Sequence, residues 1–589
     1  MYSVTEDYKT QNYRSMRNPT HVRIRFGIID PDAVGYSSPT DNGHLPWSAV
    51  EQFDSGVAVN KTYQTLEWNR FVLDGTNPLP LSSNPLFQGY VGSELSGEDG
   101  TWTTNPMVTI TFSDYINFTG LTFKFDEPFN EYPADFRIIG YTDAVETLNV
   151  LSHPTSAFYF DANAGTNINK LELVFENSGI PYRRARILEI AYGLLEILED
   201  EVVSNTTFNS TADLLSTVLP TCDFTFKFFD INQEYDPESP SDLWSFLESR
   251  QPVSYSLGYE LDDENIEWIP VINSFTTGDV KIDNAGKITT VEFKTVGLLN
   301  LLTTNYDMGV YRPSGISLYD LAVEVMTSVG YEQTITLDSS LDSIMTTAPM
   351  PVLPVNQCMQ MIANAGQCVI RTTRTGAIAI EKPLATVQDF TMDFSKMKDY
   401  PTTKKYPMLR NVISSYAKYT PETASSQLAT VDITGASATD IEVTYEMSYN
   451  QSSGVTGTLV VNSATYYAYK AVLNVTGTGT LTINGYKVIK SNVGVTKAVN
   501  IGGDDCEIAN DLVTSETDAL AYCDWVALVL NRRNEYSTSD RGYPELDVLD
   551  NVLFQGNFNS DITTTILGTK HTYNGAISGE TKLLIGGES

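Results

Sequence analysis

The sequence predicts a mainly β protein, assembled from several β-barrels and a β-sandwich, with a small α+β domain in the middle. Charged residues make up only 19% of the chain, while Thr, Ser, Asn, Gly and Tyr are plentiful, a mixture that favours strands and turns. Short segments of alternating apolar and polar residues recur along most of the sequence, and helical spacing is confined to a few stretches. A length of 589 residues indicates several domains rather than one.

The first strand is predicted at His21–Asp30, where Val22, Ile24, Phe26 and Ile28 alternate with polar residues. Residues 1–53 are therefore interpreted as an N-terminal arm and the first strand of a barrel. Between residues 54 and 195, short strands separated by turn clusters predict a β-sandwich. These strands are expected at 107–112, 121–125, 136–141 and 170–175.

Residues 196–310 repeat the β pattern and predict a first barrel, interrupted by a helix-like stretch at Ser241–Arg250. Residues 311–385 predict the α+β middle domain. One helix is expected from Ser317, as N-cap, to Gly330, and a second at Asn356–Gly366. A hairpin at Cys368–Ile380 follows.

A second barrel is predicted from residues 386–424 and 506–589. It includes a helix at 515–532, which begins at Ser515-x-x-Asp518, a loose form of the capping box. Residues 425–505 are rich in Thr, Val, Gly and Asn, with alternating segments such as Gly457–Asn462, and predict a small β insertion between the two parts.

The charge balance is strongly acidic, with 73 Asp plus Glu against 37 Lys plus Arg and a formal net charge of −36. Phosphate binding needs clustered Lys and Arg, so this balance argues against a general DNA-binding protein. An acidic surface still suits a wall that DNA slides past without binding, and solubility alone also explains it. The polar first ten residues carry no signal peptide, and no apolar run reaches the length of a membrane span.

The five cysteines are odd in number and form no CxxC pair, which argues against both a disulfide framework and a zinc site. Reduced, buried thiols are expected, consistent with assembly in a cytoplasm. These residues are Cys222, Cys358, Cys368, Cys506 and Cys523.

Catalytic motifs are not found. The four histidines (His21, His44, His153 and His571) fall in separate predicted elements, and the sequence contains no HExxH, G-x-S-x-G or phosphate-binding glycine motif. The sequence therefore predicts no enzyme, no metal and no cofactor.

Two acidic segments are compared with known kinds of site, a glycosidase carboxyl pair and a calcium loop. Glycosidase chemistry needs two carboxyls in a cleft, and the acids at 260, 262–264 and 267 fit a solvated loop better. Asp230-x-Asn232-x-Glu234-x-Asp236 has the alternating oxygens of a calcium loop, but Tyr235 replaces the required Gly and Ser241 the final Glu. A turn stabilised by Asx side chains explains this segment as well.

Two groups in the predicted sandwich are candidate binding residues. Trp68, Trp102 and Tyr132 are candidate glycan contacts, because sugars stack on aromatic rings, although core packing is the commoner use of such residues. The basic cluster Arg183, Arg184 and Arg186 is a candidate contact with an acidic neighbouring subunit; its alternative place is the outer face of a strand.

Several segments, in order along nearly the whole chain, resemble the tail-tip or baseplate hub proteins of phages and prophages, especially those of Gram-positive hosts. These segments are Tyr63–Gly75, Pro181–Gly193, Phe229–Pro237, Pro240–Gly258, Cys358–Ile380, Arg541–Asp550 and Tyr573–Gly579. The sandwich also resembles a discoidin or carbohydrate-binding insertion. Residues 425–505 have no counterpart in the family.

The resemblance implies a structural role in a virion tail, assembled in the cytoplasm of the host bacterium. The chain would form a homotrimeric ring that closes the tail tube, contacts distal tail and tail-tube proteins, and links them to fibres or a spike. Genomic DNA would pass through without specific binding. Enzymatic or receptor-binding parts are expected on other subunits, since the chain ends soon after the last barrel.

Two alternatives are kept. The first is a carbohydrate-binding adhesion module of a tail or cell surface, which would bind a host-surface glycan through the aromatic residues of the sandwich. The second is a tail-associated peptidoglycan hydrolase.

Overall fold

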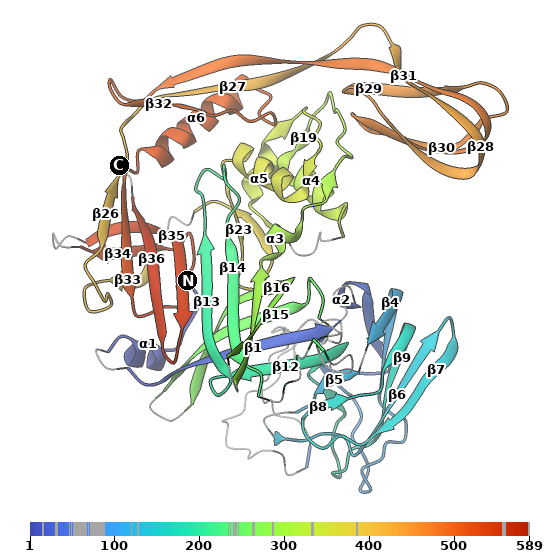
Figure 1. Cartoon of the computed structure of the whole chain (residues 1–589), viewed down its shortest axis with the longest axis vertical. Coiled ribbons are helices and arrows are strands. Elements are labelled where there is room, and N and C mark those ends of the chain that lie inside the picture. Colours follow the sequence, from blue (N-terminus) through green and yellow to red (C-terminus); the bar gives the residue numbers. More distant parts are fainter. Residues whose placement is uncertain are drawn as a thin grey trace.

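The chain folds as a mainly β protein of several domains, as the sequence predicts. The computed structural model describes residues 1–14, 17–29, 33–45, 48, 50, 67–68, 70, 89–118, 120–126, 129–231, 233, 235, 237–238, 244, 247–261, 265–285, 288–330, 335–383, 387–556 and 561–586. In Figure 1 a sandwich, two joined sheet domains and an α+β domain lie below a long arm of strands.

The first barrel combines a strand from near the N-terminus with six strands that follow the sandwich. Its antiparallel order is β12 (Gly193–Glu199), β1 (Thr20–Ile29), β15 (Pro252–Glu260), β16 (Ile266–Ala285), β17 (Ile288–Val296), β14 (Cys222–Phe229) and β13 (Val203–Thr211). The alternating residues of β1 are buried, as predicted, and Phe26 packs on Phe293 with ring centroids 4.8 Å apart. Of the predicted helix at 241–250, most residues lie outside the described part of the chain.

Strands from the C-terminal end of the chain continue the same sheet. β13 pairs with β35 (Asp561–Tyr573), which is followed by β36 (Ile577–Ile585), β33 (Asn534–Asp540) and β26 (Thr402–Lys405). β34 (Asn551–Gln555) pairs with β35 and with β25 (Val387–Met392), completing a 13-stranded sheet. Phe208 and His571 stack nearly parallel at this joint, with centroids 6.2 Å apart.

The N-terminal arm crosses from one barrel to the other. Its helix α1 (Glu6–Asn12) is capped by Thr5, and Tyr8 packs edge-on against Tyr259 of the first barrel at 5.0 Å. The Tyr8 hydroxyl donates to Glu545 of the second barrel at 2.7 Å, and the amino terminus pairs with Asp550. Burial raises the pKa of Glu545 from its ordinary 4.5 to about 7, so the contact between α1 and the second barrel contains a carboxyl that titrates near neutrality.

The sandwich packs a five-stranded sheet against a three-stranded sheet and a strand pair. The order of the large sheet is β2 (Ser37–Asp41), β4 (Met107–Phe118), β9 (Gly165–Asn177), β6 (Asp135–Thr142) and β7 (Val145–Ser152). Facing it are β11 (Glu189–Ala191), β5 (Leu121–Lys124) and β8 (Phe158–Asp161), and the pair β10 (Arg186–Ile187) and β3 (Tyr90–Val91). Because β2 pairs with β4, and α2 (Ala33–Tyr36) precedes it, the sandwich begins before the predicted residue 54.

The α+β domain contains both helices expected from the sequence. α4 (Leu318–Thr327) starts after Ser317, whose hydroxyl accepts from the Asp320 N–H, and α5 (Val355–Ala365) packs against α4. The remaining elements are short: α3 (Leu298–Leu301), η5 (Ser339–Ser343), β18 (Asn305–Tyr306), β19 (Ile316–Ser317), β20 (Ile335–Leu337), β21 (Met345–Thr346), β22 (Leu353–Pro354), β23 (Val369–Thr372) and β24 (Ile378–Glu381).

The long arm is built around β31 (Lys470–Ala498), which spans roughly 95 Å at the usual rise of a strand. It pairs with β27 (Leu409–Pro421), β28 (Ser426–Thr444), β29 (Ser448–Val455) and β30 (Val460–Tyr466), and β32 (Asp504–Glu507) joins β27. β27 therefore belongs to the arm and not to the second barrel, where the sequence placed it. α6 (Glu516–Leu530), capped by Ser515 as predicted, packs against β27 (Figure 1).

Candidate functional site at the closing end of the sandwich

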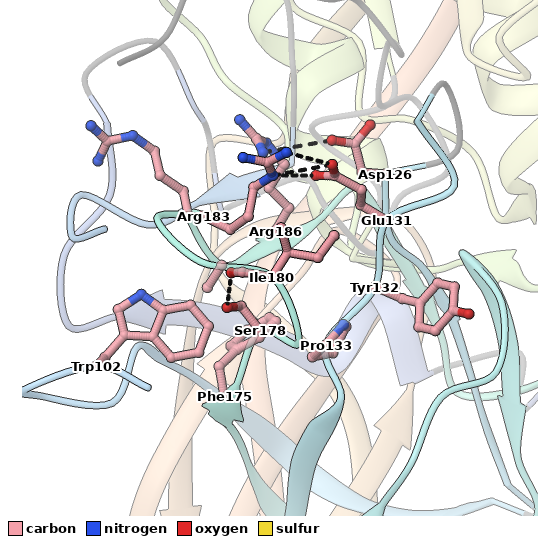
Figure 2. Close-up of a pocket in the computed structure, with 12 residues that line it drawn as sticks. Trp102, Asp126, Glu131, Tyr132, Pro133, Phe175, Ser178, Ile180, Arg183 and Arg186 are labelled. Atoms are coloured by element: carbon pink, nitrogen blue, oxygen red, sulfur yellow. Dashed lines mark hydrogen bonds and ion pairs between the residues drawn. The ribbon is translucent and has the colours of Figure 1, made fainter. Parts of the chain in front are cut away.

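The two groups of candidate residues from the sequence meet around one small cavity of the sandwich. Trp102, Tyr132, Arg183, Arg184 and Arg186 all line it, although Trp102 and Arg186 are far apart in the chain. In Figure 2, Trp102 and Tyr132 lie on opposite sides of this cavity, and Arg183 and Arg186 face Asp126 and Glu131 above it.

The arginines are engaged by carboxylates of their own domain. Arg183 makes a bidentate contact with Glu131, with Nε 2.9 Å from Oε2 and Nη2 3.0 Å from Oε1. Arg186 Nη1 donates to Glu67 Oε1 at 2.7 Å. Arg183 is only 7% exposed, so it does not lie on the outer face of a strand, and the contact of the cluster with a neighbouring subunit stays a prediction.

Arg184, the third member, turns away from the carboxylates. Its backbone N–H donates to Glu67 Oε1 at 3.0 Å, and its guanidinium donates to the carbonyls of Gly92 and Ser93. Burial lowers the pKa of its guanidinium, and Glu67 opposes that shift.

Arg70, which is also buried, completes the cluster. It pairs with Asp126 and Glu131, and its guanidinium lies 4.2 Å from the centre of the Phe129 ring. Burial, followed by the nearby Arg186 charge, lowers the pKa of Arg70 to about 10. Arg70, Arg183 and Arg186 thus balance three carboxylates, those of Glu67, Asp126 and Glu131.

This ion cluster joins two of the segments that resemble the hub family. Glu67 and Arg70 belong to Tyr63–Gly75, and Arg183 and Arg186 belong to Pro181–Gly193. Most of the first segment lies outside the described residues. The sequence did not identify four members of this cluster: Glu67, Arg70, Asp126 and Glu131. A charged residue that forms a buried ion pair has no local pattern that separates it from one on the surface, since its partner lies elsewhere in the sequence.

The cavity is too small to hold a sugar. Its volume of about 30 Å³ accommodates one or two water molecules. Trp102 is 7% exposed and packs edge-on against Phe175 at 6.3 Å, so it belongs to the core and offers no ring face to a glycan. Tyr132 is half-buried against the same core.

Trp68 has a different environment. Its side chain is 62% exposed and meets the exposed ring of Tyr182 edge-on at 6.4 Å. The indole is therefore the one member of the predicted glycan group that is open to solvent.

The histidines lie in four separate places. His21 Nδ1 is 2.5 Å from Asp200, His44 and His153 each contact a nearby aspartate, and His571 is buried at the joint of the barrels. Burial lowers the pKa of His571 to about 3, so its ring is neutral at physiological pH.

The five cysteines are free thiols, four of them buried and Cys506 half-buried. Burial raises the pKa of Cys358 and of Cys368 to about 12, which suppresses the reactive thiolate.

Within the described ranges, no group of three or more His, Cys, Asp or Glu side chains is placed to hold a metal ion. The calcium-like loop is not tested by this, because Asn232, Glu234 and Asp236 lie outside the described residues, as do the acids at 262–264. The two described acids of the glycosidase candidates are Glu260 and Glu267. Glu260 lies near His21, and Glu267 accepts from the Thr5 N–H at the start of α1. No helix in the described part of the chain is long and apolar enough to cross a membrane.

Comparison with known proteins found no matching family model and no matching curated sequence. Among solved structures, the chain is similar to a tail protein of prophage MuSo2 from Shewanella oneidensis, with 10% identity, a TM-score of 0.38, and coverage of 66% of this chain and 95% of that one. It is also similar to prophage tail protein gp18 from Listeria monocytogenes, with 9% identity, a TM-score of 0.36, and coverage of 67% and 92%. A tail protein from Neisseria meningitidis matches with 9% identity, a TM-score of 0.36, and coverage of 65% and 92%. Two of these neighbours are prophage tail proteins and the third is a tail protein.

Proposed function

We propose that this chain is a structural hub of a phage tail tip or baseplate. In this role copies of the chain form a trimeric ring that closes the tail tube, joins distal tail and tube proteins to fibres or a spike, and lets the genome pass. No catalytic reaction is part of the role. The ring would be assembled in the bacterial cytoplasm and reside in the virion tail.

The observation that carries this proposal is the joint between the barrels. Thr206–Thr211 of β13 pair with Gly568–Tyr573 of β35, so the strands of the two barrels form one continuous sheet. The arm helix α1 bridges the same two barrels through Tyr8 and Glu545. A hub has to transmit force between partners on opposite sides. Two barrels connected both by the β13–β35 pairing and by α1 resist the bending that would misalign these partners.

The ends of the sheet suit association between copies. The 13-stranded sheet ends in β12 on one side and in β26 on the other. On β12, Glu199 is paired with Arg23 of β1 and Glu196 accepts from Tyr235, whereas β26 carries the exposed Lys404 and Lys405. Two different strands at the two ends allow head-to-tail packing, which closes into a ring when the rotation between copies permits it. Such packing also covers strand edges that would otherwise invite aggregation.

The overall charge suits a channel for DNA. A net charge of −36 repels phosphates, so a ring of these chains would not retain a passing genome. The test is the native mass of the purified protein, measured by mass photometry at low and moderate salt. A species of three times the 65.1 kDa chain mass supports the ring, and a strict monomer at all concentrations and salts contradicts self-assembly.

A carbohydrate-binding role of the sandwich is the second candidate, and the exposure of Trp68 favours it. Saturable binding to a glycan array that Trp68→Ala abolishes would support this role. Binding that persists in Trp68→Ala would remove it, since Trp102 and Tyr132 are engaged in the core.

A further inference from the structure

A polar groove of about 440 Å³ crosses the joint between the two barrels. Its floor is the outer face of β13, β35, β36 and β33, and the loop of residues 393–401 forms one wall. Five separate segments of the chain contribute to it, so the groove exists only when the C-terminal strands are paired with β13.

The floor offers hydrogen-bond donors and acceptors side by side. Lys570 and Glu580, opposite each other on β35 and β36, are paired at 2.9 Å. In the next row of the sheet Lys582 lies opposite Ser537, and within the described residues it has no ion-pair partner. Asn209, Ser537 and Ser539 provide the rest of the polar floor, whereas the side chains of Thr538, Thr569 and Thr581 are buried.

The wall presents an aromatic ring to solvent. Tyr400 is 76% exposed, more than any other aromatic side chain in the described part of the chain. Phe394, also exposed, contacts it edge-on at 5.5 Å, so the ring is oriented by a neighbour and is not drawn into the core.

The loop that carries Tyr400 is fixed to the sheet. The Lys398 N–H donates to the Ser539 carbonyl at 2.8 Å, Met397 forms a bridge with Asp540, and Asp393 accepts from the Ser395 N–H at 2.8 Å. The exposed Tyr400 ring is therefore held beside the groove by a loop that is bonded to the sheet.

We propose that this groove binds a neutral oligosaccharide, with Tyr400 stacking on a sugar ring and the floor bonding its hydroxyls. Sugar hydroxyls both donate and accept, which matches the amide of Asn209, the hydroxyls of Ser537 and Ser539, and the Lys582 ammonium. The carboxylates of Asp399 and Glu580 are balanced by the ammonium groups of Lys570 and Lys582, so the groove has no net charge and suits a neutral ligand. A protein partner would need a larger apolar centre than the two rings provide. The site is separate from Trp68 and does not depend on formation of a ring.

The test uses the labelled full-length chain on an array of immobilised neutral and anionic oligosaccharides, with titration of each positive spot. We expect saturable binding to neutral oligosaccharides, weakened about tenfold by Tyr400→Ala, because the stacking contact is lost. Lys582→Met keeps the alkyl stem and should weaken binding severalfold. Both side chains are exposed, so unchanged thermal transitions are expected in both variants.

Two matched controls locate the effect. Trp68→Ala removes the exposed indole of the sandwich, and Tyr319→Ala removes an exposed tyrosine of α4, 37% exposed. Neither should change binding. The proposal is overturned by three results: no saturable binding on the array, binding confined to anionic sugars, or binding that is lost in Trp68→Ala and kept in Tyr400→Ala. A change of native mass in Tyr400→Ala without any sugar response also overturns it, because the groove would then be a contact between copies.

Discussion

Replacing Glu545 by glutamine tests whether the N-terminal arm is held by a protonated carboxyl. Glu545 is fully buried beneath α1, where Tyr8 donates to Oε2 at 2.7 Å and Tyr13 donates to Oε1 at 3.2 Å. Burial raises its pKa from 4.5 to about 7 in the closed arm. When the arm opens, the carboxyl meets water and its pKa returns toward 4.5.

The sign of the pH effect follows from these two values. Below about pH 4.5 both states are protonated, and the full stability of the closed arm is present. Between pH 4.5 and about 7 the open state loses its proton while the closed state keeps it, so raising the pH favours opening. The closed arm loses about 3 kcal/mol over this window, and this contribution becomes constant above pH 7.

The measurement is amide hydrogen exchange of peptides covering residues 1–14, at several pH values from 5 to 8, corrected for intrinsic exchange rates. In the wild type, protection should fall as the pH rises through this range. Glu545→Gln keeps the size of the side chain and cannot ionise, so its protection should stay nearly constant. Glu146→Gln, an exposed change on β7, is the control and should behave like the wild type.

Two other buried groups titrate in the same range. Burial raises the pKa of Asp540 to about 6, which also lowers stability as the pH rises, and His571 acts in the opposite direction. Both are retained in the variant, so the difference between variant and wild type isolates Glu545. Equal pH slopes in the two proteins would refute the assignment.

Three further changes test the interior. Glu131→Gln removes the carboxylate shared by Arg70 and Arg183 and leaves a buried excess of positive charge; it should destabilise the sandwich by roughly 3–5 kcal/mol in urea unfolding, against under about 0.5 kcal/mol for Glu146→Gln. In His571→Phe a buried imidazole is removed, whose pKa is lowered by burial from 6.5 to about 3. This shift destabilises the wild-type fold as the pH falls below 6.5, so the variant should gain roughly 3 kcal/mol relative to wild type between pH 7 and pH 4. Equal acid sensitivity of the two proteins would contradict this. Ser515→Ala removes the side chain that accepts from the Asp518 N–H at 3.1 Å, and should cost about 1 kcal/mol, seen as faster hydrogen exchange in the first turn of α6, whereas Ser340→Ala in η5 should leave that exchange unchanged.

The elements whose signals are local were predictable from the sequence. The alternation of Val22, Ile24, Phe26 and Ile28 fixes which face of β1 is buried, whatever strands lie beside it. Ser317 and Ser515 mark the starts of α4 and α6 because a capping hydroxyl bonds to backbone N–H groups only a few residues away. The mainly β class follows from the same short-range patterns.

The sequence identified only part of the candidate site. The sequence selected Trp102 and the arginines at 183–186, and the structure places them around one cavity. Their roles came out differently, since Trp102 is a core residue and Arg183 and Arg186 pair with buried carboxylates. An arginine destined for a buried ion pair has the same local pattern as one on a surface, because the partner carboxylate lies elsewhere in the sequence.

The sequence by itself determined which segments are strands, which are helices and which faces are apolar. Only the tertiary structure decided that β13 pairs with β35, that β27 joins the arm, and that Glu67 meets Arg186. The physical reason is that an alternating strand is satisfied equally by many neighbours, so its partner is chosen by the packing of the whole chain. The groove beneath Tyr400, formed by five segments, follows from that choice and from no single segment.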